Sequence, residues 1–239
     1  GLFGTNSSGK TSILQTLLLL KQTAESPDRK RVLHTGDDRS LVDLGTYYDI
    51  IHDHRLESAI RFELGWQLAE SLRIADPEQA RKTLYDLEEL DFEVDILVGR
   101  DRAYVEQFMY RFDEHAFGLT RSRKANGQGK DEYELQTDDY PARRTTGRPW
   151  PLPSPSKCYG FPDEASTYYQ NTGFLPDFVR AFEDALDRIA YLGPLREYPR
   201  RTYVWAGERP VDVGQKGEQA IPALLAARAE NLKSGRGVG

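Results

Sequence analysis

The first hydrophobic stretch of the chain has the spacing of an α-helix. Its apolar residues recur at intervals of three and four positions, and side chains at these intervals share one face of a helix. They are Ile13, Leu14, Leu17, Leu18 and Leu20. Pro27 follows and ends such a helix, because proline has no backbone N–H to donate. The pattern therefore predicts a helix from about Lys10 to Ala24.

Later stretches alternate apolar and polar residues, which is the pattern of a half-buried strand. They cover residues 56–66, 91–99, 103–112, 115–121 and 131–137. The last two are separated by RKANGQGKD, which is rich in turn residues. We expect these stretches to form an antiparallel meander. A shorter strand is expected within residues 29–36, after a basic turn.

Two more helices are predicted in the rest of the chain. Asp76 is a typical cap residue and Pro77 suits the first helical position, so a short helix is expected over residues 76–90. A second helix is expected after residue 173, with one face formed by Phe174, Phe178, Val179, Phe182 and Leu186. Residues 189–194 then resemble a buried strand, and a loop and a short helix close the chain.

Residues 138–172 differ in character from the stretches on either side. Five prolines lie within the first half of this segment, at positions 141, 149, 151, 153 and 155. Proline cannot donate to a strand ladder, and the segment is longer than an ordinary connection. We therefore expect an irregular surface loop or insertion that is either mobile or covers the surface as an irregular excursion, and that limited proteolysis cleaves first.

The amino-acid composition favours a globular protein and disfavours several other classes. Hydrophobic residues make up 38% of the 239 residues and charged residues 29%, which suits a globular protein with a polar surface. The net charge of −6 argues against a globally basic nucleic-acid binder. Cys158 is the single cysteine, so no internal disulfide can form, as in a reducing cytoplasm. Leu17–Leu20 is too short to span a membrane, and we expect no membrane partner.

A phosphate-binding motif stands at the beginning of the predicted first helix. The sequence GTNSSGKT, residues 4–11, fits G-x-x-x-x-G-K-[ST] at every fixed position. Glycines let successive N–H groups turn inward around phosphates, and the following helix adds its positive end. Lys10 can reach the β- and γ-phosphates, and the Thr11 hydroxyl can ligate Mg²⁺. The candidate ATP site is Gly4, Thr5, Asn6, Ser7, Ser8, Gly9, Lys10, Thr11 and Ser12, with Lys10 also the catalytic candidate and Thr11 the metal ligand.

The alternative is a Gly/Ser loop that only caps a helix. Four constrained positions recur by chance in about one chain of this length in a hundred, so we favour nucleotide binding. A working P-loop ATPase also needs an acidic metal and water site on an apolar strand. No stretch of the sequence has that form, and no LSGGQ-type signature follows. We therefore expect a piece of a longer protein that lacks its first strand and the rest of its ATPase domain.

Two distant stretches resemble one family. GTNSSGKTSILQTLLLLKQT is similar to the P-loop of bacterial ATPases in the SMC/RecF/OLD branch of the ABC-type superfamily. IAYLGPLREYPRRTYVWAGERPVDVGQKGEQAIPALL resembles the segment that these proteins carry ahead of their signature motif, and LVDLGTYYDIIHDH resembles their segment after the first helix. The resemblance covers both ends and the front third of the chain, and the middle is weakly supported.

The resemblance implies an α/β fold, a P-loop NTPase core of ABC/SMC type beside an antiparallel β-rich portion. It divides the chain into a P-loop region (1–75), a β-rich portion (76–137), an irregular insertion (138–172) and a segment ahead of the missing signature motif (173–239). It also implies ATP-driven homodimers, in which each nucleotide lies between one subunit's P-loop and the other's signature. Such relatives act in DNA repair, chromosome maintenance or antiphage defence, often with DNA or a nuclease as partner.

Smaller signals are weaker. His52 and His54 would share one face of a strand, but no third metal ligand is nearby. Arginines interleaved with aromatic residues could contact nucleic acid, although a solvated loop is the simpler reading; they are Arg196, Tyr198, Arg200, Arg201, Tyr203 and Trp205. The acidic run around Glu88 suits a solvated helix end. His115 and Cys158 suggest no catalytic pair.

The sequence thus predicts ATP binding, with hydrolysis in the intact cytoplasmic dimer and negligible turnover by this piece alone. Two other functions remain open. A P-loop phosphotransferase acting on a small molecule would need a substrate pocket and an arginine-rich lid, and neither is evident in the sequence. A binding module that uses nucleotide only as a structural ligand would show no turnover at all.

Overall fold

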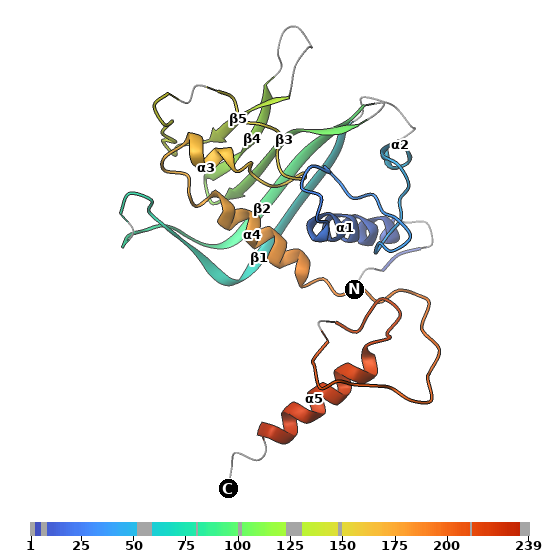
Figure 1. The fold of residues 1–239 in the computed structure, drawn as a ribbon. Coiled ribbons are helices and arrows are strands. Elements are labelled where there is room, and N and C mark those ends of the chain that lie inside the picture. Colours follow the sequence, from blue (N-terminus) through green and yellow to red (C-terminus); the bar gives the residue numbers. More distant parts are fainter. Residues whose placement is uncertain are drawn as a thin grey trace. The chain divides into compact units, whose positions relative to one another are not determined.

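The computed structural model describes residues 3–5, 9–51, 59–79, 81–99, 102–122, 131–147, 150–210 and 212–234. The chain divides into two compact units, Gly1–Arg188 and Ile189–Gly239. The first unit contains a five-stranded sheet with helices packed on it (Figure 1). The second contains an irregular segment and one helix, α5 (Ala220–Ser234).

The sheet is an antiparallel meander whose strands lie side by side in chain order. Its strands are β1 (Ala59–Ala75), β2 (Thr83–Val98), β3 (Ala103–Phe112), β4 (His115–Ser122) and β5 (Glu132–Thr137). The expected meander is therefore present. The expected α/β fold with a P-loop NTPase core is wrong, because every strand pair that the structure describes is antiparallel, whereas such a core has a parallel sheet.

One face of the sheet carries the core. Aromatic side chains in register form a row across neighbouring strands, because Phe92 lies opposite Tyr110 and Tyr110 lies opposite Phe117. Helix α4 (Leu175–Asp187) covers this row. Its Phe178 stacks on Tyr110 with ring centroids 5.8 Å apart, and its Phe182 contacts Phe92 at 4.6 Å. The predicted helix face after residue 173 is confirmed, since four of its five residues are buried.

Strand β1 is an edge strand with a large irregularity. Gln67 pairs with Glu89 and Leu72 pairs with Leu87, so four residues of β1, 68–71, stand opposite a single residue of β2. Such bulges bend a strand and redirect its side chains. The bulge of β1 faces helix α4 and forms one wall of a cavity described below.

The predicted helix over residues 76–90 is wrong. Strand β1 continues to Ala75, a turn follows, and β2 begins at Thr83. Asp76 caps this turn, since its carboxylate accepts the backbone N–H of Glu78 at 2.8 Å. A cap residue followed by proline starts a turn as readily as a helix. The pairing of residues between Thr83 and Leu90 with β1 decided the outcome here.

Two predicted strands are also absent. Residues 189–194 and 29–36 are described, and neither forms a strand. In the first stretch Ile189 is half-buried and Leu192 is exposed. A short apolar run does not by itself specify a strand, because it needs a partner strand to satisfy its backbone.

Residues 138–172 are irregular as expected, apart from helix α3 (Glu164–Tyr168) and three isolated bridges. The expectation of a mobile surface excursion does not fit the packing. Several of its side chains are buried in the first unit, among them Leu152, Cys158, Tyr159, Phe161 and Tyr169. Proline-rich chain therefore supplies part of the hydrophobic core that covers the sheet, and we now expect it to resist proteases.

Candidate functional site

The phosphate-binding motif lies at the N-terminus of helix α1 (Lys10–Glu25), one residue longer than the predicted helix. Gly9 stands just before the helix with φ of 81°, in the left-handed region that favours glycine. A Cβ built at Gly9 would meet no atom within 4 Å. A larger residue at position 9 would therefore strain the backbone, although its side chain would meet no neighbouring atom.

Lys10 folds back over the beginning of the motif. Its ammonium donates to the carbonyl oxygens of Gly4 at 2.8 Å and Thr5 at 2.7 Å. These contacts draw the chain before the helix around the lysine, so the two ends of the motif lie close together. Asn6, Ser7 and Ser8, which the sequence places at the centre of the site, lie outside the described residues.

The first turn of α1 has no side-chain cap and no acidic residue. The first N–H groups of a helix have no partner within the helix, and they carry its positive dipole end. Thr11 and Ser12 are exposed in this turn. Helix N-termini of this kind are general binding sites for anions such as phosphate.

The other end of α1 is fixed by polar groups that the sequence did not reveal. The Gln22 side chain donates to the carbonyls of His34 (2.5 Å) and Val42 (3.1 Å) and accepts the N–H of Val42 (3.0 Å). Thr23 accepts the N–H of His34 at 2.9 Å. In the sequence, a glutamine and a threonine in a leucine-rich helix resemble ordinary surface residues. Only the fold shows that residues 34–42 form hydrogen bonds with them.

A lysine from the proline-rich segment closes the same end. Lys157 donates from its ammonium to the carbonyl of Ala24, and its N–H donates to the carbonyl of Arg29 at 2.8 Å. A cation at a helix C-terminus is favoured by the helix dipole. Arg29 in turn forms an ion pair with Asp163 at 2.9 Å. Burial lowers the pKa of Lys157, as expected for an ammonium taken from water.

The other titratable candidates have structural surroundings. His115 packs on Tyr85 and Phe112 with ring centroids 4.8 and 5.4 Å away. Cys158 is fully buried, and burial raises the pKa of its thiol to about 12. His52 and His54 lie outside the described residues. Among the residues that are described, no group of three His, Cys, Asp or Glu could hold a metal ion.

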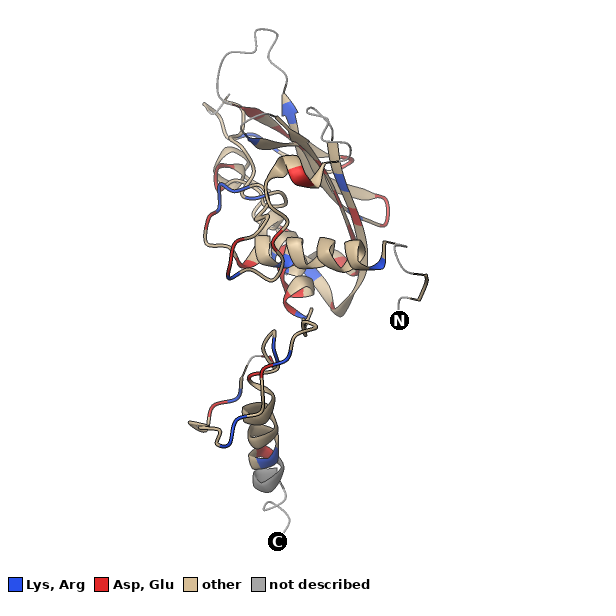
Figure 2. Cartoon of the chain, turned by 90° about the vertical axis from the view of Figure 1, so that its right-hand side faces the viewer, with Lys and Arg blue, Asp and Glu red and all other residues tan. Residues whose placement is uncertain are grey.

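The arginine and aromatic residues of residues 196–205 lie in the second unit. Arg200 forms an ion pair with Glu197, and the Tyr203 hydroxyl accepts the Arg200 N–H at 3.0 Å. Tyr198 is 90% exposed. This unit has eight Lys or Arg against five Asp or Glu, although the whole chain is acidic (Figure 2).

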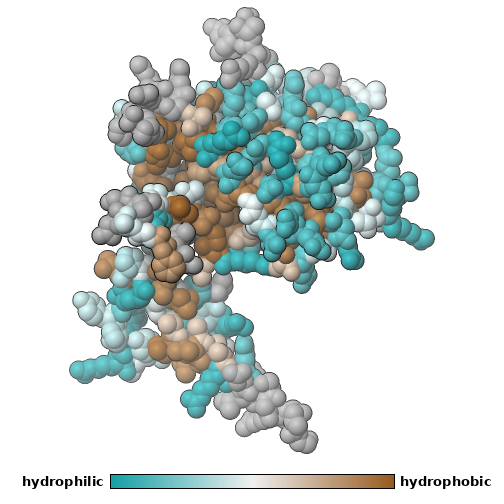
Figure 3. Space-filling model, turned by 180° about the vertical axis from the view of Figure 1, so that it is seen from behind, coloured by the Kyte–Doolittle hydropathy of each residue, from teal (hydrophilic) through white to brown (hydrophobic). Residues whose placement is uncertain are grey.

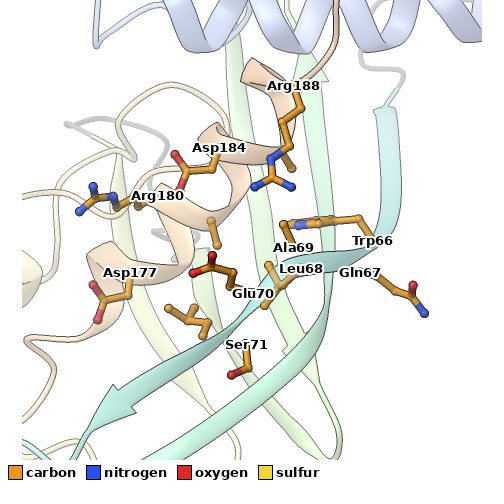
Figure 4. Close-up of a pocket in the computed structure, with 13 residues that line it drawn as sticks. Trp66, Gln67, Leu68, Ala69, Glu70, Ser71, Asp177, Arg180, Asp184 and Arg188 are labelled. Atoms are coloured by element: carbon orange, nitrogen blue, oxygen red, sulfur yellow. The ribbon is translucent and has the colours of Figure 1, made fainter. Parts of the chain in front are cut away.

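A cavity of the first unit lies away from the motif. It measures about 560 Å³ and lies between helix α4 and the bulge of β1 (Figure 4). None of its lining residues belongs to the phosphate-binding motif. In Figure 4 the Arg188 guanidinium points toward Trp66, and the Glu70 carboxylate points toward α4.

No protein-family model, curated protein or solved structure matches the chain. Within the described residues, no helix has the length and apolar character needed to cross a bilayer.

Proposed function

We propose that the chain binds ATP with Mg²⁺ at the N-terminus of helix α1. The observation that carries this proposal is the local geometry of the motif. A left-handed glycine leads into an uncapped helix, and the next residue is a lysine whose ammonium folds over the beginning of the loop. The proposal rests on this geometry and on the motif pattern, and it requires no parallel sheet.

Each residue has a distinct part in this proposal. Backbone N–H groups between Gly4 and Gly9 and in the first helical turn bind the phosphates. Lys10 exchanges its two carbonyl partners for phosphate oxygens, which bind an ammonium more strongly because they are charged. Thr11 would hold Mg²⁺ through its hydroxyl, and the ion would supply neutralisation of the phosphate charge.

Hydrolysis is proposed for the intact protein as an ATP-bridged homodimer. The support is the resemblance in sequence to SMC/RecF/OLD ATPases, which also suggests DNA-related work in the cytoplasm, with DNA or a nuclease as partner. In such a dimer Lys10 would stabilise the charge that develops on the transferring phosphate. The chain itself offers no recognisable acidic strand to orient the water, so we expect it to bind ATP weakly and to release negligible phosphate.

Calorimetric titration of ATP with Mg²⁺ tests the binding proposal. We expect Lys10→Ala to weaken ATP binding about tenfold to a hundredfold, because it removes a charge-assisted contact. Lys30→Ala is the matched control, since Lys30 is an exposed lysine outside the motif. Equal affinity for the parent chain and Lys10→Ala would refute the proposal. Robust phosphate release by the monomer would show that the catalytic acid lies within these residues.

A further inference from the structure

Four charged side chains lie along one flank of helix α4 and its C-terminal cap residue. Asp177, Arg180, Asp184 and Arg188 all line the cavity beside β1. None of their side chains forms an ion pair or hydrogen bond with any residue that the structure describes. Arg180, Asp184 and Arg188 are exposed, and Asp177 is half-buried. Figure 4 shows Asp177 and Arg180 pointing away from β1, whereas the Arg188 guanidinium points toward Trp66 of β1.

The signs of these charges alternate along the flank. Successive members are separated by three, four and four positions, so they form one stripe along the helix. Neighbours in such a stripe can form ion pairs within their own helix, which is the simplest reading of alternating signs. No hydrogen bond or ion pair joins two members of the stripe among the described residues, although the charge of Arg180 opposes the rise that burial causes in the pKa of Asp177. Arg180, Asp184 and Arg188 are exposed and can therefore meet a partner.

The stripe is complementary to itself when a second copy of the helix runs antiparallel to it. Asp177 then lies opposite Arg188 of the second copy, and Arg180 lies opposite Asp184. A two-fold axis repeats both pairings, so four pairs of opposite charge form at once. A parallel arrangement would instead set each charge against its own copy. Charge alone therefore favours the antiparallel arrangement over the parallel one.

The remaining side chains of the flank suit a close approach. Ala181 and Ala185 lie between the charges and line the same cavity. Small side chains let two helices pack at short distance. Glu70, on the opposite wall of the cavity, adds a third carboxylate that a guanidinium of the second copy can meet. Burial already raises the pKa of Asp177, and an opposed arginine would favour its charged form.

We infer that this flank of α4 is a docking surface for a second copy of the same chain, with the two α4 helices antiparallel. The association needs no nucleotide and does not depend on the function proposed above. Because α4 has only 13 residues, the interface is small, and the dimer is weak and sensitive to salt. It is thereby distinct from a dimer held together by ATP.

Charge reversal tests the inference without removing any core residue. Sedimentation equilibrium at low salt, without nucleotide, should show a monomer–dimer equilibrium for the parent chain that weakens as salt is added. Arg180→Asp should weaken dimerisation about tenfold. In each copy the new aspartate faces Asp184 of the other copy, so two repulsive contacts form in every dimer. Asp184→Arg should do the same. Arg81→Asp and Glu114→Arg, at exposed positions outside α4 and outside the cavity lining, are the matched controls.

Mixing the two variants gives the decisive result. In an antiparallel pair, Arg180→Asp presents only acidic groups at positions 180 and 184, and Asp184→Arg presents only basic groups. The mixture should therefore form a heterodimer at least as tight as the parent dimer, and the double variant should dimerise again with itself. A parent chain that stays monomeric at low salt and high concentration would overturn the inference. Loss of dimerisation in both single variants without recovery in the mixture would also overturn it.

Discussion

Within helix α1, residues 18–23 are all buried, whereas residues 11–14 are all exposed. The buried half packs in the first unit and is held by Gln22, Thr23 and Lys157. The exposed half carries the phosphate-binding motif and leaves hydrophobic side chains in solvent. Ile13 is 53% exposed and Leu14 is 50% exposed. One helix thus has one end that is packed into the fold and one end that is exposed and carries the phosphate-binding motif.

This difference teaches that the motif adds little to the stability of the first unit. Binding residues are often drawn from the least stable parts of a protein, because they must exchange partners. Figure 3 shows one face of the molecule, on which hydrophobic surface gathers on one side of the first unit and hydrophilic surface covers much of the other side. Variants at the two ends of α1 should therefore separate stability from binding.

The largest effect is expected from one substitution made at both ends of the helix. Leu20→Ala should lower the free energy of unfolding by about 2–5 kcal/mol, because it leaves a cavity at a residue that is 1% exposed. Leu14→Ala should cost less than about 1 kcal/mol, because half of that side chain is already in water. Urea unfolding measures both. Similar losses for the two variants would remove the contrast between the ends.

A smaller loss is expected from Gln22→Ala. The substitution removes three hydrogen bonds and leaves the N–H and carbonyl of Val42 without their partner. Buried polar groups that lose a partner cost about 1–3 kcal/mol each, so unfolding should become easier by at least that amount. Gln15→Ala, in the half-buried middle of the same helix, is the control and should change stability by only a few tenths of a kcal/mol. A loss no larger than that of the control would show that residues 34–42 are not anchored through Gln22.

Gly9→Ala should cost about 1 kcal/mol of stability. An L-residue is strained at φ of 81°, whereas the new methyl group meets no neighbour. The strain should be relieved by a change in the backbone at the motif, so ATP affinity should fall as well. Gly147→Ala is a matched control, because Gly147 has a similar φ of 80° with equally open space and lies outside the motif. Equal ATP affinity in the two variants would show that the conformation of Gly9 does not matter for binding.

Cys158 reports on the buried end of α1, because it follows Lys157. Its pKa in the folded protein is raised to about 12, above the ordinary value of 9. The thiol therefore contributes stability below about pH 9, and this contribution is lost as the pH rises from 9 toward 12. At pH 8 the native thiol should react with iodoacetamide far more slowly than the urea-unfolded thiol. Equal rates would mean that the segment opens freely.

Much of the sheet and both long helices of the first unit follow from local patterns. Alternation specified the strands of the meander, and the spacing of Phe178 and Phe182 specified the buried face of α4. The fold class did not follow, because GTNSSGKT is a local motif and says nothing of how strands pair. The resemblance led to a parallel core that the described strands do not have. The strand in residues 83–90 was missed because its charged residues suited a helix equally well.

Within the candidate site, the sequence specified the motif and the beginning of its helix. It could not specify the contacts of Gln22, Thr23 and Lys157, because these residues meet partners that are distant along the chain. The sequence also could not specify the surroundings of the charge stripe of α4, because its spacing suggests ion pairs within the helix. Whether those pairs form depends on side-chain positions that periodicity does not encode.

Thermal unfolding with and without Mg²⁺ and ATP tests the central claim most directly, by comparing the parent chain, Lys10→Ala and Leu20→Ala. A ligand that binds only the folded state stabilises it by an amount set by its concentration and affinity. We predict that Leu20→Ala melts at a much lower temperature but keeps the full shift on adding ATP. Lys10→Ala should melt like the parent chain without ATP and lose most of the shift. An undiminished shift in Lys10→Ala, or no shift in the parent chain at saturating ATP, would contradict nucleotide binding at the exposed end of α1.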